Sequence, residues 1–427
     1  MKMKDSGIAW IGEIPEEWEL VKTRRFFSNH KQVVGEKVDK YERLALTMNG
    51  VIKRSKDDSD GLQPERFETY QILHKNELIF KLIDLENIKT SRVGLSPYTG
   101  LVSPAYIVLS SRFEDNRFFY YWFMFMYYNQ VFNNLGGNGV RSALNAKDVL
   151  MLPVPNIRFP EQRRIADYLD RKCSQIDAII ARQQEVIEKL KAYKLSVITE
   201  AVTKGLNPHA PMKDSGVEWI GEIPEQWENR KMISILSMRV VDGPHESPEL
   251  YDEGIPYISA TAVENGKINF DLMRGYISEE YCNICDLRYK PQLHDILVIK
   301  LGASTGQVAI VETTDRFNIW VPLAAVRCNE KADPYFVYYA FQSDYFLKQM
   351  EMSWTYGTQQ TLGVKSIERL RIMLPTLEEQ KEIVCYLKSK CDSIDAAVKN
   401  KEILIDKLAD YKKTFIYEVV TGKDKII

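Results

Sequence analysis

The sequence predicts an α+β protein in which two globular domains are separated and joined by two long helices that form an antiparallel coiled coil. Three observations predict this architecture. A segment near the start of the chain recurs near its middle, a second block recurs just before each of two heptad-patterned regions, and the stretches between these blocks share much less sequence. The chain is therefore expected to be an internal pseudo-twofold, or circular, repeat of one domain-plus-helix unit.

The composition limits the class of protein. With 427 residues, 45% of them hydrophobic and 11% aromatic, the chain can bury more than one core. Its 57 basic and 59 acidic residues give a net charge of -2, so a nucleic-acid partner must meet local basic surfaces. The start of the chain lacks a secretory signal, and the longest apolar run, residues 118–128, is too short to span a bilayer. We expect a cytoplasmic protein without a membrane partner.

The cysteines do not suggest a metal or a disulfide framework. Six cysteines in a chain of this length are expected to be reduced thiols. Cys282 and Cys285 have metal-ligand spacing, but no second pair lies near them, which favours a structural role over zinc. We expect no metal and no cofactor on this chain.

The repeat sets the domain boundaries. Residues 3–19 recur almost unchanged as residues 212–228, and residues 160–169 match residues 377–387. The period is about half the chain, which indicates duplication of a whole domain rather than a solenoid. The predicted parts are an opening segment (1–19), domain one (20–155), a first helix (156–204), a linker with the second opening segment (205–228), domain two (229–375), a second helix (376–422) and a tail (423–427).

Each helix has a heptad pattern. The first has one series seven residues apart and a second series at the complementary position, and the second helix repeats this pattern. Each helix of about 40 residues would be roughly 60 Å long. The alternative is that each packs on its own domain, but two equal heptad helices favour pairing with each other. The series are Leu169, Ile176, Gln183, Leu190 and Val197 with Ile179, Val186 and Tyr193, widened by Ile180 and Ile187, then Leu387, Ile394, Lys401, Leu408 and Phe415 with Ala397, Leu404 and Tyr411.

The direction of the helices follows from the chain order. The first helix leads directly into the second opening segment and domain two, so the second helix must start at the far end of the first, and the pair is antiparallel. Gln183 and Lys401 are polar at seam positions near the helix centres, and we expect them to meet and fix the register. The circular order also places the two chain ends close together.

The helix ends carry recognisable signals. Thr376 and Glu379 have the spacing of a capping box, and Pro160 suits a first helical turn. Gly205 and Gly422 are placed where the helices should stop.

Domain one offers two candidate DNA-binding segments. Basic residues dominate residues 22–56, which is a plausible phosphate-facing surface, although a solvated charged face is the simpler explanation. Residues 136–142 form a Gly-rich loop containing Asn138, Arg141 and Ser142, side-chain types that contact adenine, guanine and phosphate.

Domain two has a loop at the corresponding place, residues 357–361, with Gln359 and Gln360. For either loop, a plain surface turn is an equal alternative. Residues 300–307 resemble a phosphate loop but lack its Gly-Lys-Ser/Thr ending, so we exclude nucleotide binding and expect Lys300, Ser304 and Gln307 to face DNA.

Aromatic residues gather at equivalent places in both halves. The runs 118–123 and 335–341 could stack on bases, but their density favours buried core helices. Trp10, Trp18, Trp219 and Trp227 are expected to anchor the opening segments.

Two rival functions are less consistent with the sequence. A single-chain enzyme would need an Asn-Pro-Pro-Tyr or Asp-Pro-Pro-Tyr motif, a Walker loop or a metal cluster, and the sequence has none of these. A structural scaffold whose domains bind proteins stays open, and salt-dependent, sequence-selective DNA binding would separate it from a DNA-recognition protein.

The duplicated frame resembles that of type I restriction-modification specificity subunits. The resemblance rests on Glu161-Gln162 and Glu379-Gln380 with the helical blocks that follow, and it covers the whole chain. Segments 242–248, 254–258 and 295–302 of domain two resemble target-recognition-domain signatures, and segments 82–84 and 100–106 of domain one resemble those of a different class.

The resemblance implies a non-catalytic subunit that binds double-stranded DNA. Each target-recognition domain would recognise one half of a bipartite, asymmetric site, with half-site centres about 34 to 36 Å apart. The helices would set the spacing and hold two modification subunits, which methylate adenine from S-adenosylmethionine. Restriction subunits would join, and ATP and magnesium would also belong to partner subunits. The candidate DNA contacts are Lys53, Arg54, Lys56, Arg92, Asn138, Arg141, Ser142, His245, Lys300, Ser304, Thr305, Gln307, Gln359, Gln360 and Lys365.

Overall fold

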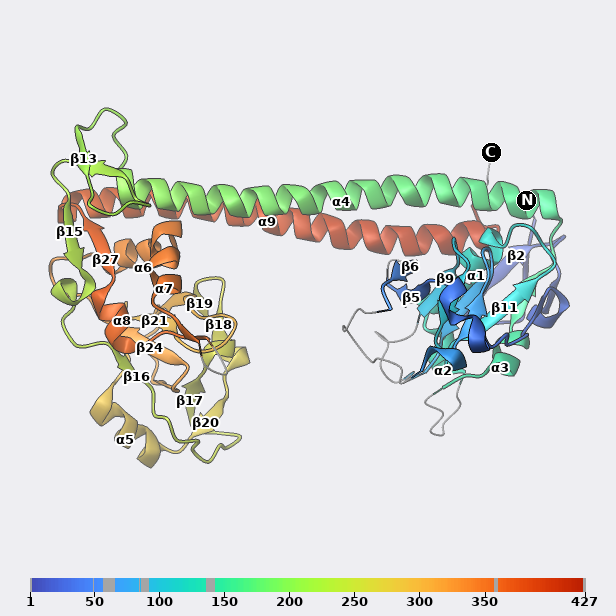
Figure 1. The fold of residues 1–427 in the computed structure, drawn as a ribbon, viewed down its shortest axis with the longest axis horizontal. Coiled ribbons are helices and arrows are strands. Elements are labelled where there is room, and N and C mark those ends of the chain that lie inside the picture. Colours follow the sequence, from blue (N-terminus) through green and yellow to red (C-terminus); the bar gives the residue numbers. More distant parts are fainter. Residues whose placement is uncertain are drawn as a thin grey trace. The chain divides into compact units, whose positions relative to one another are not determined.

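The computed structural model describes residues 2–48, 50–56, 66–83, 85, 92–135, 143–356 and 360–424. It divides into two compact units (Figure 1). Unit 1 comprises Met1–Gln184 and Glu402–Ile427, and unit 2 comprises Glu185–Lys401. Two long helices, α4 (Phe159–Lys204) and α9 (Leu377–Val420), contribute a section to each unit. Each unit therefore contains one globular domain and one section of paired helix.

Unit 1 begins with a hairpin of β1 (Met3–Asp5) and β2 (Glu13–Pro15). Domain one then forms a closing pair of strands, two four-stranded sheets and short helices. The closing pair is β3 (Leu20–Lys22) with β12 (Pro153–Pro155). One sheet has the order β6 (Gly50–Arg54), β5 (Arg43–Thr47), β10 (Gly100–Val102), β7 (Gln71–Leu73), and the other β4 (Phe27–Ser28), β11 (Ile107–Ser111), β8 (Leu78–Lys81), β9 (Arg92–Leu95). The helices are α1 (Arg117–Tyr128), α2 (Val131–Asn134) and α3 (Ala146–Leu150), with 3-10 turns at Thr23–Arg25, Gly35–Lys40 and Phe67–Thr69.

Unit 2 follows the same plan. Its opening hairpin is β13 (Met212–Asp214) with β14 (Glu222–Pro224), and its closing pair is β15 (Glu228–Lys231) with β27 (Arg371–Leu374). The sheets are β16 (Val241–Asp242), β24 (Leu323–Val326), β21 (Ile296–Ile299), β22 (Val308–Ile310), and β20 (Gly275–Ile277), β17 (Ile255–Ile258), β23 (Asn318–Ile319). Two hairpins are β18 (Val263–Glu264) with β19 (Lys267–Ile268) and β25 (Thr355–Tyr356) with β26 (Gln360–Thr361). The helices are α5 (Glu279–Arg288), α6 (Pro334–Gln342), α7 (Asp344–Met352) and α8 (Val364–Arg369), with 3-10 turns at Met232–Ile235, Ala260–Ala262 and Phe270–Leu272.

The two domains share a sheet order although their sequences differ. Domain one has the sheet order β4-β11-β8-β9 and domain two the order β16-β24-β21-β22. In both sheets the strand that comes first in the chain lies beside the strand that comes last, and the last strand also pairs with the first strand of a hairpin. All of these neighbours are antiparallel. One backbone topology therefore supports two different sets of loops.

The aromatic runs form core helices, as predicted. On α1, Phe118, Phe119, Trp122, Phe123 and Phe125 are buried, and on α6 Phe336, Val337, Ala340 and Phe341 are buried. Base stacking by these rings is therefore excluded. No helix among the described residues combines the length and apolar character that a membrane crossing requires.

The Glu-Gln signature has a structural explanation. The Gln162 amide is buried and donates to the carbonyl oxygen of Ile157 at 2.9 Å, and the buried Gln380 amide donates to that of Pro375 at 3.0 Å. Each Gln thus ties the end of a domain to the start of its long helix. Glu379 accepts a hydrogen bond at 3.0 Å from the indole of Trp227, which is fully buried, so the second opening segment is anchored to α9.

The tryptophan anchors are confirmed in part. Trp18 and Trp227 are buried, and Trp10 lies against Phe125 with a centroid distance of 5.9 Å. Trp219 is 41% exposed, so its predicted anchoring role is wrong. The loop between β13 and β14 does not bring this ring into the domain core.

Of the two residue series predicted to form the helix seam, the first is confirmed and the second is wrong. The first series is buried or partly buried, but Ile179 and Tyr193 of the predicted second series are 46% and 53% exposed. The second seam position is instead Cys173, Ile180, Ile187 and Lys194 on α4 and Cys391, Val398, Ile405 and Lys412 on α9. Apolar residues stand at both 179–180 and 186–187, so spacing alone cannot choose between them. Packing decides, because a two-helix seam covers only one of the two positions.

Ion pairs within each unit show the antiparallel direction. In unit 1 the ammonium group of Lys412 lies 2.6 Å from the carboxylate of Asp177, and in unit 2 that of Lys194 lies 2.6 Å from Asp395. Along α4 the partner positions on α9 therefore run in reverse. Gln183 and Lys401 belong to different units, so their meeting stays a prediction.

The helix ends agree with the sequence signals. Gly205 and Gly422 have φ values of +73° and +72°, the left-handed conformation of a glycine C-cap. The backbone N–H of Glu379 donates to the Thr376 hydroxyl at 3.3 Å. Near the chain ends, the Tyr417 hydroxyl donates to the carbonyl oxygen of Ile11 at 3.1 Å. The predicted proximity of the first and last segments is thus confirmed within the described residues.

Candidate nucleic-acid interface

In domain two, the structure brings together two segments that the sequence singled out separately. The N–H of Gly302 donates to the carbonyl oxygen of Gln360 at 3.1 Å, and the N–H of Leu362 donates to that of Lys300 at 2.8 Å. The turn 300–307 is therefore paired with β26. Ser304 and Gln360 are half-buried in this patch, Gln307 is exposed, and Lys365 is exposed at the start of α8.

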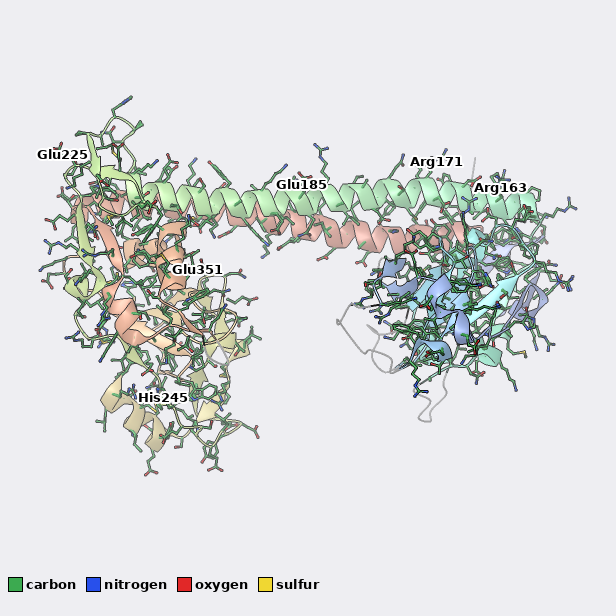
Figure 2. All side chains as sticks on the ribbon, viewed as in Figure 1. Arg163, Arg171, Glu185, Glu225, His245 and Glu351 are labelled. Atoms are coloured by element: carbon green, nitrogen blue, oxygen red, sulfur yellow. The ribbon has the colours of Figure 1, made fainter. Side chains whose placement is uncertain are left out.

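A buried carboxylate collects basic groups beside this turn. Asp242, at the end of β16, lies 2.9 Å from the Lys300 ammonium group and 3.2 Å from Nε2 of His245, and it also pairs with Arg288 at the end of α5. Burial alone would raise the pKa of Asp242, but the hydrogen bond and charge of Lys300, with Arg288 and His245, lower it. Asp242 is therefore ionised. Figure 2 labels His245, which lies near α5 at the end of domain two that is remote from the long helices α4 and α9.

The backbone at Gly243 fixes this cluster. A Cβ added at Gly243 would lie 2.3 Å from the carbonyl oxygen of Ile319, closer than any side chain allows. The strand end can therefore approach the backbone of residues 319–320 only with glycine, which positions Asp242 and His245 on either side. This explains the glycine at position 243.

Two predicted contact residues of domain two need correction. The Lys300 side chain is only 8% exposed and is engaged by Asp242, so it is not a surface phosphate contact. Thr305 is buried, and its hydroxyl donates to the carbonyl oxygen of Gly302 at 2.7 Å, so it holds the turn closed. Lys300 directly follows β21, all four residues of which are buried, and Thr305 lies in the turn after it.

Domain one presents its described candidates on β6, just after it, and on β9. The Lys53 ammonium group is half-exposed and lies 2.5 Å from Glu42, whose hydrogen bond raises the pKa of Lys53. Arg54 and Arg92 are half-buried, and Lys56 donates to the carbonyl oxygen of Val38 at 2.8 Å. These four residues remain candidate contacts. Asn138, Arg141, Ser142 and Gln359 lie outside the described residues.

The structure also identifies basic residues that the sequence analysis missed. Arg288 is half-exposed and pairs with Asp242, which is 46 positions away in the chain. Arg274 stacks on Trp320, with its guanidinium carbon 3.3 Å from the ring centroid. No spacing rule connects such distant positions. The only available signal for Arg288 was its place at the end of a short helix with an acidic first turn.

Cys282 and Cys285 lie on α5 and are buried. Burial raises the pKa of the Cys282 thiol to about 11, which keeps it protonated, whereas a metal ligand must be a thiolate. Among the described residues, no group of three His, Cys, Asp or Glu side chains could hold a metal ion.

Comparison with known proteins agrees with this architecture. A family model described as the type I restriction modification DNA specificity domain matches residues 224–405. A putative type I restriction enzyme MjaX specificity subunit of Methanocaldococcus jannaschii is 26% identical over 450 residues, covering 97% of this chain and 96% of the relative. Residues 224–405 thus match the type I restriction modification DNA specificity domain, and the chain over nearly its whole length is similar to a type I restriction enzyme specificity subunit.

Another specificity subunit and a solved structure are also similar to this chain. The EcoBI specificity subunit of Escherichia coli is 27% identical over 302 residues, covering 67% of this chain and 61% of that subunit. A chain from a solved structure concerned with complex assembly and conformational transition of the type I R-M system has a TM-score of 0.66 and 15% identity, covering 95% of this chain and 98% of that one. This likeness shows a shared fold of two domains joined by a coiled coil.

Proposed function

We propose that this chain is a non-catalytic specificity subunit, a DNA reader in which each target-recognition domain recognises one half of an asymmetric bipartite site. One observation carries the proposal. The two domains share an opening hairpin, a closing strand pair and a sheet order, yet differ in the polar loops that this frame presents. Recognition of two unlike half-sites requires a shared scaffold that carries different contact residues in each domain.

The experiment is a selection of random DNA duplexes by the purified chain, repeated at several salt concentrations. We expect two enriched blocks of sequence separated by an unselected spacer, and an affinity that falls linearly on a logarithmic salt scale. A protein scaffold would show neither. Methylation by the purified chain without partners would revive the enzyme alternative.

The helices carry a feature suited to partner subunits. In each unit, further apolar residues stand one position before the residues of the second seam series. They occupy the heptad position that flanks the buried seam. In unit 1 these are Ile179, Leu404 and Tyr411, which are 46%, 38% and 56% exposed, and in unit 2 they are Val186, Tyr193 and Ala397, of which Tyr193 is 53% exposed. Each unit thus offers one stripe for a helix of a modification subunit, which accounts for two such subunits. S-adenosylmethionine, ATP and magnesium would then be bound by the partners.

We expect the single changes Tyr411→Ser and Tyr193→Ser each to remove one modification subunit from the complex, and the double change to remove both. A buried aromatic anchor contributes about 2 kcal/mol or more, so affinity at the altered stripe should fall at least about 30-fold. The mass of the complex, measured by light scattering, gives the stoichiometry.

The matched controls are Lys189→Ser and Lys407→Ser, exposed residues at equivalent places on the same helices. They should leave two modification subunits bound. A full complex with the double tyrosine variant would contradict the assignment of the stripes.

A further inference from the structure

Asp242, Arg288, Lys300 and His245 form a cluster with an excess of positive charge. Asp242 supplies one negative charge, whereas Lys300 and Arg288 each supply a positive one, and His245 lies against the same carboxylate. The Lys300 side chain is 8% exposed and the Asp242 side chain 10% exposed, so water screens this part of the cluster weakly. A positive charge of this kind inside a domain favours an anion at the nearest accessible point.

The accessible part of the cluster is formed by Arg288 and His245. Their side chains are 50% and 68% exposed, and both are oriented by the same buried carboxylate. Asp242 occupies only part of the five N–H donors of Arg288, and no other acceptor for Arg288 is found among the described residues. The remaining donors are thus available to a ligand, while the pairing with Asp242 limits the rotamer entropy that binding would cost.

The site is specific to domain two. The shared sheet order makes β4 and β8 of domain one the counterparts of β16 and β21. Ser28 stands at the end of β4, and Leu82 follows β8, where domain two has Asp242 and Lys300. Among the described residues, these two strand ends of domain one therefore lack the Asp–Lys pair found in domain two.

We propose that Arg288 and His245, held by Asp242 and backed by the buried charge of Lys300, bind one phosphate of the DNA backbone in the half-site of domain two. This inference rests on the proposed function. A phosphate is favoured over a base edge because it carries a full negative charge that balances the excess of the cluster, whereas base edges are neutral. The site would fix the position of domain two on the duplex without selecting a base.

The test measures the affinity of the full chain for its selected DNA with the changes Arg288→Gln and Arg288→Lys. We expect Arg288→Gln to weaken binding about tenfold and to lower the salt slope by about one. Arg288→Lys, which keeps the charge, should retain most of the slope. The base preference at every position of both half-sites should be unchanged.

A second measurement locates the phosphate. Methylphosphonate groups are placed one at a time along the duplex, each removing one backbone charge. With the unaltered chain, one position in the domain-two half-site should weaken binding, and with Arg288→Gln the same position should have no further effect. This result does not depend on the absolute stability of the variant, because both duplexes are compared on the same protein.

The control is Lys267→Gln, which removes an exposed charge from β19 of the same domain. If Arg288→Gln and this control have the same affinity and salt slope on DNA that the unaltered chain binds selectively, the proposed phosphate site is wrong. The proposed function is then unaffected. A changed base preference at one position also overturns the phosphate site, in favour of base contact. Failure of the unaltered chain to select any DNA overturns the proposed function and this site together.

Discussion

Replacing residues 229–375 with the corresponding domain of another specificity subunit is expected to change one half of the methylated DNA site and to leave the other half unchanged. The closing strands β15 and β27 pair from Glu228↔Leu374 to Lys231↔Arg371, so the two ends of domain two lie side by side. The hydrogen bond from Gln380 to Pro375 lies at the graft boundary, and the hydrogen bond from Trp227 to Glu379 lies outside it. The frame should therefore accept a new domain without a change in the helices.

The measurement is mapping of methylated adenines in a genome that carries the chimera and the modification subunits. The spacer should keep its length, because the helix pair is untouched. The control is a chain with the native domain two and the same junction residues, which should methylate the original site. A chimera that changes both half-sites, or neither, would show that the two domains do not divide recognition as proposed.

The change Asp295→Ala is expected to destabilise domain two by about 3–5 kcal/mol. Asp295 is 1% exposed and accepts hydrogen bonds from the Arg327 guanidinium at 2.7 Å, the Tyr289 hydroxyl at 2.7 Å and the backbone N–H of Gln292 at 2.8 Å. Without the carboxylate, the charge of Arg327 and the two other donors lose their acceptor inside the domain. The effect is large because three donors converge on one buried carboxylate, and without it the Arg327 guanidinium would be left with the carbonyl oxygen of Lys290, 2.9 Å away.

The free energy of unfolding of domain two is measured by urea denaturation of the full chain, with hydrogen exchange in β21 and β24 as the probe of this domain. The matched control is Asp252→Ala, an exposed aspartate of the same domain, which should change that free energy by no more than about 0.5 kcal/mol. Equal urea midpoints for the two variants would show that the Asp295 network does not stabilise the domain. Domain one should keep its hydrogen-exchange protection in both.

The architecture followed from the sequence because it is encoded by repetition. The duplicated opening segments and the Glu-Gln blocks each recur with the same local structure, and the seven-residue spacing of Leu169, Ile176 and Val197 needs only the geometry of a helix to be interpreted. The C-cap glycines and the buried aromatic helices are likewise local patterns. Such features depend on residues close together in the chain.

Tertiary structure alone decided which helix face is buried and which charges meet. Ile179 and Ile180 are equally apolar, and only packing against α9 buries one more than the other. Lys300 has the charge of a phosphate ligand, yet the fold places it inside the domain against Asp242, and Arg288 becomes the exposed cation instead. A carboxylate and its partners 46 and 58 positions away are brought together by sheet order, which no local pattern encodes. The frame of this protein is therefore encoded by local and repeated sequence patterns, whereas long-range packing determines which side chains the frame exposes.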